Sequence, residues 1–124
     1  MTRMKKILIV DDADNQRRLV RVVLEKGGFH VVEAHDGADA LALATADIDL
    51  IITDYYMPGM DGVQLVDKLS QTLDMKNVPV IMLTSTNVPD IKRAARDVGI
   101  IAWLTKPLNP ERLLGTINTL FKDS

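Results

Sequence analysis

Polar side chains that could do chemistry follow most of the short apolar runs of this sequence. They are Asp11 and Asp12, Asp54, Thr84 and Ser85, and Lys106 with Pro107 after it. Three carboxylates that lie close together repel one another unless a cation shares their charge. Mg²⁺ prefers hard oxygen ligands, usually one or two carboxylates with waters and an oxygen of a phosphate. If the fold gathers these residues, their types predict a magnesium site that handles phosphate.

The remaining polar residues would complete a site for phosphoryl transfer. Lys106 supplies a point charge suited to a phosphoryl oxygen, and the Thr84 hydroxyl could donate a hydrogen bond to another. Asp54 could itself be the nucleophile, because carboxylates form aspartyl phosphates in some enzymes. A cation, an ammonium and a hydroxyl would stabilise the charge on the transferring group. A single aspartate at a strand end is more often a helix N-cap or a solvated loop residue, so the prediction depends on the whole set.

Apolar runs alternate along the chain with segments of helical periodicity. The runs are Ile7–Val10, the weaker Val31–Val32, Leu50–Ile52, Val80–Leu83 and Ile100–Leu104. They are continuous, which indicates strands buried on both faces of a parallel sheet. Between them, apolar residues recur three and four positions apart: Leu19, Val22 and Val23; Ala38, Leu41 and Ala42; Val66, Leu69 and Leu73; Ile91, Ala94, Ala95 and Val98; Leu113, Ile117, Leu120 and Phe121. Asn109–Pro110 predicts the start of the last helix.

Alternation of strand and helix five times predicts an α/β fold with a doubly wound parallel sheet and right-handed crossovers. The 124 residues of the chain hold too few units for an eight-stranded barrel. In open sheets of this kind, ligands bind beyond the carboxyl ends of the strands, where the strand order reverses. The polar residues described above follow the strands at that edge.

Composition restricts the class of function. The chain has 15 basic and 17 acidic residues, a net charge of -2 and no cysteine. We therefore expect no direct binding of nucleic acid through bulk charge, and no disulfide or thiolate chemistry. The first apolar run is too short for a signal peptide, and no run approaches the ~20 residues of a membrane span. We expect a cytoplasmic protein without membrane contact, in which residues 1–124 form a single domain and no output domain is present.

Four motifs resemble the receiver domain of two-component response regulators. They are Ile7–Asp12, Asp54–Gly62, Leu83–Ser85 and Trp103–Pro107. Each motif alone is weak, but all four in this order, on a fivefold β/α alternation, are specific. The resemblance covers essentially the whole chain. It implies a stand-alone receiver similar to a chemotaxis regulator, with a five-stranded flavodoxin-like (βα)5 fold and strand order 2-1-3-4-5.

The resemblance also implies a metal site and a phosphorylation site. Asp54 would be the phosphoacceptor. Asp12, Asp54 and the backbone oxygen of Tyr56 would bind Mg²⁺ directly, and Asp11 would act through a water on the metal. Mn²⁺ could substitute for Mg²⁺.

The same resemblance implies a conformational switch. Lys106 would pair with Asp54 at rest and with the phosphoryl group afterwards, and the Lys106–Pro107 bond would be cis. Thr84 would move to hydrogen-bond the phosphoryl group, and Trp103 would follow it inward. Trp103 stands where Tyr or Phe is more usual, so plain core packing is the alternative reading of this residue.

The function implied is two-component signal transduction. A sensor histidine kinase or histidine phosphotransfer protein would donate the phosphoryl group, and the chain would then bind a downstream protein through its fourth helix, fifth strand and fifth helix. It would be a monomer or a phosphorylation-dependent dimer. It would not be an enzyme beyond catalysing its own phosphorylation and dephosphorylation.

Three other functions remain open at this point. The chain could be a phosphorelay intermediate that passes its phosphoryl group to a histidine phosphotransfer protein. It could be a pseudo-receiver without phosphorylation, although the intact polar set argues against this. It could be a phosphohydrolase of the aspartyl-phosphate type, but that chemistry commonly needs an acid two residues after the nucleophile, where Tyr56 stands. Separately, Arg17, Arg18 and Arg21 give the first helix a basic face, which is more simply a solvated face than a docking site for an acidic phosphodonor.

Overall fold

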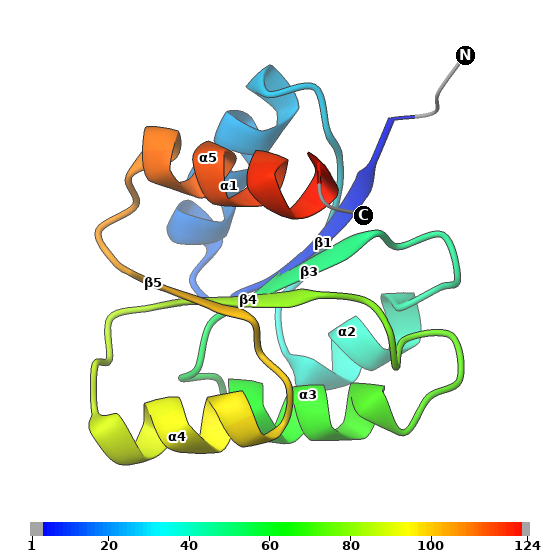
Figure 1. Ribbon diagram of the computed structural model, residues 1–124, viewed down its shortest axis with the longest axis vertical. Helices are drawn as coiled ribbons and strands as arrows, with labels where there is room; N and C mark the ends of the chain where they lie inside the picture. Colours follow the sequence, from blue (N-terminus) through cyan, green and yellow to red (C-terminus); the bar gives the residue numbers. More distant parts are fainter. Residues whose placement is uncertain (1–3, 123–124) are drawn as a thin grey trace.

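The structure is a computed structural model that describes residues 4–122. Strands and helices alternate along the chain, as the sequence predicts (Figure 1). The elements are β1 (Lys6–Val10), α1 (Asp14–Lys26), β2 (His30–Ala34), α2 (Gly37–Leu43), β3 (Leu50–Thr53), α3 (Gly62–Ser70), β4 (Val80–Thr84), α4 (Pro89–Asp97), β5 (Ala102–Thr105) and α5 (Pro110–Lys122). Within the described residues, no helix has the length and apolar character needed to span a membrane.

All strands are parallel and lie in the order β2-β1-β3-β4-β5, which confirms the predicted fold class. The chain moves from β1 to β2 on one side and then returns to place β3 on the other side of β1. Val10 is therefore in register with Thr53, and the Asp54 N–H donates to the Val10 carbonyl at 3.0 Å. The reversal of strand order brings the residues that follow β1 beside the residues that follow β3.

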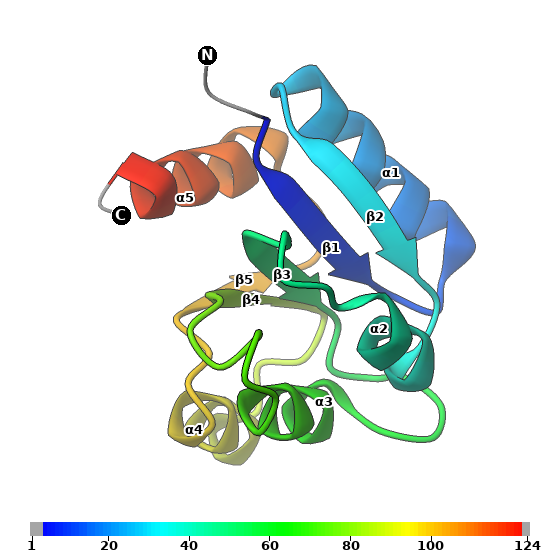
Figure 2. The same ribbon diagram turned by 90° about the vertical axis from the view of Figure 1, so that its right-hand side faces the viewer.

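Helices cover both faces of the sheet. Figures 1 and 2 show α1 and α5 on one face and α2, α3 and α4 on the other. Successive residues of β1 alternate between the two interfaces: Leu8 and Val10 pack on the α2–α4 side, and Ile7 and Ile9 on the α1–α5 side. This double burial explains why the strand sequences are continuously apolar.

Helix α1 buries only part of the face expected. Val23 is half-buried and packs on the core as expected, and Val20 and Leu24 are buried, whereas Leu19 and Val22 are exposed. The sequence places apolar residues next to each other at 19–20 and at 22–24. Two stripes with helical spacing are therefore available, and periodicity alone does not select the one that faces the sheet.

Strand β5 starts later than predicted, at Ala102 rather than Ile100. Gly99 has a φ of 98°, and the N–H groups of Gly99 and Ile100 donate to carbonyls in the last turn of α4. These bonds make Gly99 and Ile100 part of the C-terminal cap of α4, so β5 begins after them. Ile101 is consequently exposed in the connection to the strand.

The start of α5 and the end of α3 can be compared with the bounds that the sequence predicts. Helix α5 begins at Pro110 as predicted, and the Asn109 side chain accepts a hydrogen bond from the Arg112 N–H at 3.0 Å. Helix α3 ends at Ser70, so Leu73 does not extend its apolar face as expected. Leu73 instead lies exposed in a series of turns.

Helix α3 begins directly against the end of β3 because its first residue has no side chain. The Gly62 N–H donates to the Tyr55 carbonyl at 2.8 Å. A Cβ atom at Gly62 would lie 2.3 Å from the Asp54 carbonyl oxygen. The Asp61 side chain caps the helix by accepting a hydrogen bond from the backbone of its third residue. The position of α3 and the backbone at Asp54 are therefore fixed together.

We predict that Gly62→Ala lowers the free energy of unfolding by about 1–3 kcal/mol, since the added methyl group must displace backbone. Gly115→Ala is the matched control: it is also a helical glycine, and nothing lies within 4 Å of its Cβ position. This control should raise the free energy of unfolding by about 1 kcal/mol. Urea denaturation measures both. Equal stability of Gly62→Ala and the wild type would contradict the close approach.

Candidate functional site

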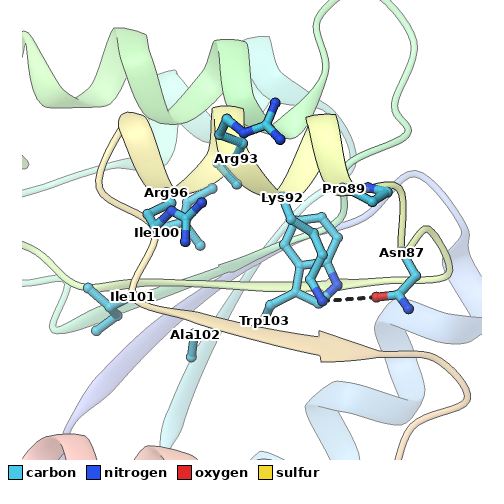
Figure 3. A pocket seen from close by; sticks show the side chains of 10 residues that line it. Asn87, Pro89, Lys92, Arg93, Arg96, Ile100, Ile101, Ala102 and Trp103 are labelled. Carbon is cyan, nitrogen blue, oxygen red and sulfur yellow. Dashed lines mark hydrogen bonds between the residues drawn. The ribbon is translucent and has the colours of Figure 1, made fainter.

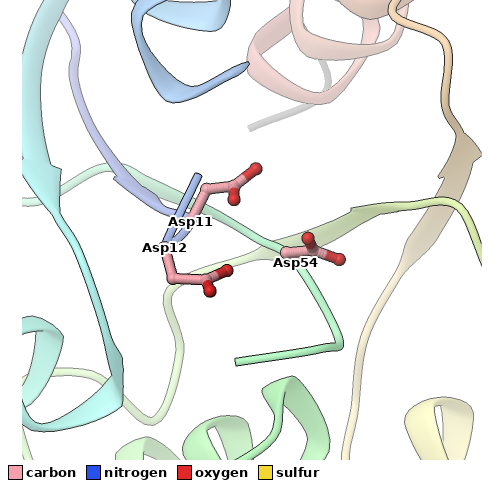
Figure 4. Close-up of side chains that lie close together, drawn as sticks. All are labelled: Asp11, Asp12 and Asp54. Atoms are coloured by element: carbon pink, nitrogen blue, oxygen red, sulfur yellow. The ribbon is translucent and has the colours of Figure 1, made fainter. Parts of the chain in front are cut away.

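Three aspartates meet at the carboxyl ends of β1 and β3. Asp11, Asp12 and Asp54 each offer a carboxylate oxygen, and these oxygens all lie within 4.8 Å of one another. Figure 4 shows the side chains of Asp11 and Asp12 extending to the side on which Asp54 lies. Asp11 is 6% and Asp54 9% exposed, whereas Asp12 is open to solvent. The site therefore has a buried floor and one acidic side chain at its mouth.

Lys106, the residue that follows the edge strand β5, supplies the counter-charge. Its Nζ donates to Asp11 Oδ2 at 2.9 Å and to Asp54 Oδ2 at 3.0 Å. Its N–H donates to the Thr84 carbonyl at 2.9 Å, and the peptide bond to Pro107 is cis. Burial alone would lower the pKa of Lys106, but the hydrogen bonds to Asp11 and Asp54 outweigh it and raise the pKa above its ordinary value. The side chain is therefore an ammonium at neutral pH.

Backbone groups orient the two buried carboxylates. The Ala13 N–H donates to Asp11 Oδ1 at 2.9 Å, and the Tyr55 N–H donates to Asp54 Oδ1 at 2.6 Å. Each carboxylate thus has one oxygen held by nearby backbone and the other held by Lys106. The N-cap of α1 is Ala13, without a side-chain cap. The reading of Asp11 or Asp12 as a mere helix cap is therefore wrong.

Two buried polar groups, one on β4 and one on β5, have no partner. Among the described residues, the buried side-chain atoms without a hydrogen bond are Thr84 Oγ1 and Trp103 Nε1. Thr84 ends β4 and is fully buried. An unsatisfied buried hydroxyl costs free energy that a ligand oxygen within reach would recover. Ser85, the next residue, is exposed.

The donor set fits a divalent cation. Three carboxylates and one ammonium leave a local excess of two negative charges. All candidate ligands are hard oxygens, which suit Mg²⁺. Tyr56 lies with Asp12 around an open hollow of about 530 Å³. Its ring is exposed and packs edge-on against that of Tyr55, with centroids 4.9 Å apart.

Comparisons with known proteins agree with this arrangement. Residues 7–118 match the response regulator receiver domain. The chain belongs to this family. The receiver is 36% identical over 118 residues to the protein PilH of Pseudomonas aeruginosa, a match that covers 94% of this chain and 98% of PilH. It is 34% identical over 119 residues to the chemotaxis protein CheY-3 of Vibrio cholerae, which covers 94% of this chain and 92% of CheY-3.

A solved structure extends the similarity to three dimensions. The chemotaxis protein CheY4 of Vibrio cholerae, crystallised at low pH, superposes on the receiver with a TM-score of 0.90 at 40% identity. The superposition covers 94% of this chain and 98% of that one. The similarity therefore spans the whole sheet and the helices on both of its faces.

The receiver also brings to the site a residue that sequence analysis assigned to a solvated face. Arg17 is only 14% exposed, and its Nη1 donates to the Asp11 carbonyl at 2.7 Å. Arg21, on the same helix, pairs with Glu33 of β2. The prediction of a solvated face is therefore wrong for Arg17, whereas Arg18 is exposed and Arg21 is half-exposed. No local sequence signal points to this, because Glu33 lies in another element.

We predict that Lys106→Met lowers the free energy of unfolding of the metal-free receiver by about 3 kcal/mol, because it leaves two buried carboxylates without a counter-charge. Added Mg²⁺ should stabilise the variant more than the wild type. Since the pKa of Lys106 is raised by folding, the difference in stability should be full below the ordinary pKa of lysine, and it should shrink as the pH rises from there through the raised value.

Urea denaturation with and without Mg²⁺ at several pH values measures these effects. Lys76→Met is the control, because Lys76 is exposed in the turns after α3, and it should change stability by less than about 0.5 kcal/mol. A Lys106→Met receiver as stable as the wild type would contradict the role of Lys106 as counter-charge.

Proposed function

We propose that the receiver accepts a phosphoryl group on Asp54 from the phosphohistidine of a sensor histidine kinase or histidine phosphotransfer protein. The observation that carries the proposal is the Lys106 ammonium, which joins Asp11 to Asp54. The Lys106 N–H also bonds the backbone of Thr84, whose buried hydroxyl has no partner. Membership of the receiver family supports a histidine kinase as the partner. The acidic set supports Mg²⁺ as the cofactor.

The proposed cation would be held by Asp12, Asp54 and the backbone oxygen of Tyr56. Asp11 would act through a water on the ion, while one of its oxygens accepts from the Ala13 N–H and the other from Lys106. When bound, Mg²⁺ supplies positive charge that offsets the charge on the oxygens of the transferring phosphoryl group.

The proposed transfer is an in-line displacement at phosphorus with Asp54 as the nucleophile. An oxygen of Asp54 attacks phosphorus in line with the bond to the histidine nitrogen. The new O–P bond forms as the N–P bond breaks, and the imidazole leaves with the electron pair of that bond. The Lys106 ammonium then pairs with the phosphoryl oxygens instead of the Asp54 carboxylate, and the Thr84 hydroxyl donates to one of these oxygens.

The proposed switch runs from Thr84 to the neighbouring strand β5. In the β4–β5 register, Trp103 pairs with Met82, two positions before Thr84. Lys92 of α4 lies 5.6 Å above the Trp103 ring and donates to Asn87 Oδ1 at 3.0 Å (Figure 3). Movement of Thr84 toward a phosphoryl group would free space near Trp103, and these contacts connect Trp103 to α4.

The proposed downstream surface includes a cleft between α4 and β5. The cleft has a volume of about 590 Å³ (Figure 3). Three basic side chains of α4, Lys92, Arg93 and Arg96, line it together with the apolar Ile101 and Trp103. This combination supports a downstream partner that presents acidic and apolar side chains together.

We predict that acetyl phosphate labels the wild-type receiver only when Mg²⁺ is present, and that Asp54→Asn abolishes the labelling because an amide oxygen is a poor nucleophile. Asp67→Asn is the control, since Asp67 is an exposed acid of α3, and it should be labelled at the wild-type level. Intact-mass spectrometry measures the added phosphoryl group. Undiminished labelling of Asp54→Asn, or labelling in excess chelator, would sink the proposal.

We predict that beryllofluoride with Mg²⁺, which imitates an aspartyl phosphate, shifts the fluorescence emission of Trp103. The signal is specific because the chain has a single tryptophan. Thr84→Val removes the hydroxyl with little change of volume, and it should greatly reduce the emission shift while acetyl phosphate labelling persists. Wild-type emission that does not respond to beryllofluoride would show that Trp103 only packs in the core.

A further inference from the structure

The guanidinium of Arg17 holds three separate segments together. Its Nε donates to Glu33 Oε1 at 2.8 Å, its Nη1 to the Asp11 carbonyl at 2.7 Å, and its Nη2 to Asp14 Oδ1 at 2.8 Å. These bonds join β2, the end of β1 and the first turn of α1. The rigid planar fork of arginine directs its donors to three acceptors at once, and the single ammonium of lysine has no such geometry.

The Asp11 carbonyl belongs to the peptide that connects Asp11 to Asp12. Because a peptide unit is planar, fixing its carbonyl oxygen also fixes the direction in which the chain enters Asp12. The Asp11 N–H is held by the Ala34 carbonyl at 3.2 Å. Arg17 thus holds the backbone at the point between the two acidic residues.

Glu33 keeps Arg17 in this position. Its Oε1 accepts from Arg17 and its Oε2 from Arg21. Burial would raise the pKa of Glu33, but the hydrogen bonds from Arg21 and Arg17 outweigh it and hold the pKa below its ordinary value. Glu33 is therefore ionised at neutral pH. Its negative charge also balances the positive charge of Arg17, which lines the same small hollow as Asp11 and Asp54.

We infer that Arg17, held by Glu33, is a positioning residue for the divalent-cation site. It fixes the Asp11–Asp12 peptide so that the two carboxylates are spaced for the ion before the ion arrives. The inference rests on the proposed Mg²⁺ site. By this inference Arg17 raises the affinity for the cation, whereas its positive charge alone would lower that affinity.

Two variants separate position from charge. Arg17→Lys keeps the charge and loses the planar fork, and Arg17→Met loses both. We expect the Kd for Mg²⁺, measured by isothermal titration calorimetry at fixed ionic strength, to rise on the order of tenfold in both, as is typical when a partner of a metal ligand is removed. If Arg17 acts only as a charge, Arg17→Lys will bind like the wild type and Arg17→Met will bind more tightly. Either of these results overturns the inference.

Control variants test whether the effect is local. Arg18→Met removes a charge from the exposed side of the same helix, and its Kd should equal that of the wild type. Glu33→Gln leaves Arg17 in place but weakens its anchor, so it should give a Kd between those of the wild type and Arg17→Met. A Glu33→Gln Kd equal to that of the wild type would contradict the role of Glu33.

Stability measurements distinguish positioning from a purely structural role. Urea denaturation of each variant without metal reports folding, and calorimetry is performed where each variant is fully folded. A loss of stability with an unchanged Kd would overturn the inference and leave the proposed function intact. A wild-type receiver that binds no Mg²⁺ would instead defeat the proposed function, so the two failures are distinguishable.

Discussion

Repulsion among three carboxylates is the constraint on which the rest of the receiver depends. Asp11 and Asp54 are buried and Asp12 lies beside them, an arrangement that a protein selected only for stability would avoid. The doubly wound sheet makes it possible, since it brings two acids from the end of β1 and one from the end of β3. It also delivers the Lys106 ammonium from the loop after β5. The acidic site lowers the free energy of unfolding, and the apolar side chains buried on the two faces of the sheet compensate for this loss.

Much of the fold and most of the site could be predicted from the sequence. Continuous apolar runs indicated buried parallel strands, and the residues that follow these runs, Asp11, Asp54 and Lys106, do meet. These predictions succeeded because parallel strands all end at one edge, so a position in the sequence fixes a position in the fold. The order of the strands came from the family resemblance, because periodicity carries no information on which strands are neighbours.

The predictions that failed depended on contacts between elements. Adjacent apolar residues at 19–20 left the buried stripe of α1 undetermined. Arg17 lies among other charged residues in the sequence, and its partner Glu33 is 16 positions away on β2. Only the packing of α1 against β2 turns this charge inward. The unpartnered Thr84 and Trp103 atoms were likewise beyond prediction, because satisfaction of a hydrogen bond depends on everything around the atom.

The sheet divides the interior into two sets of buried side chains that have no member in common. Arg17 and the rest of α1 belong to one side, and α4 with its basic cleft belongs to the other (Figure 1). Substitutions that refashion the α4 surface therefore need not disturb the packing beneath α1. The proposed downstream surface can therefore change in sequence without altering the acidic site or the helix beside it. The architecture thus allows the proposed recognition surface to diverge on one face while the acidic site at the edge of the sheet stays the same.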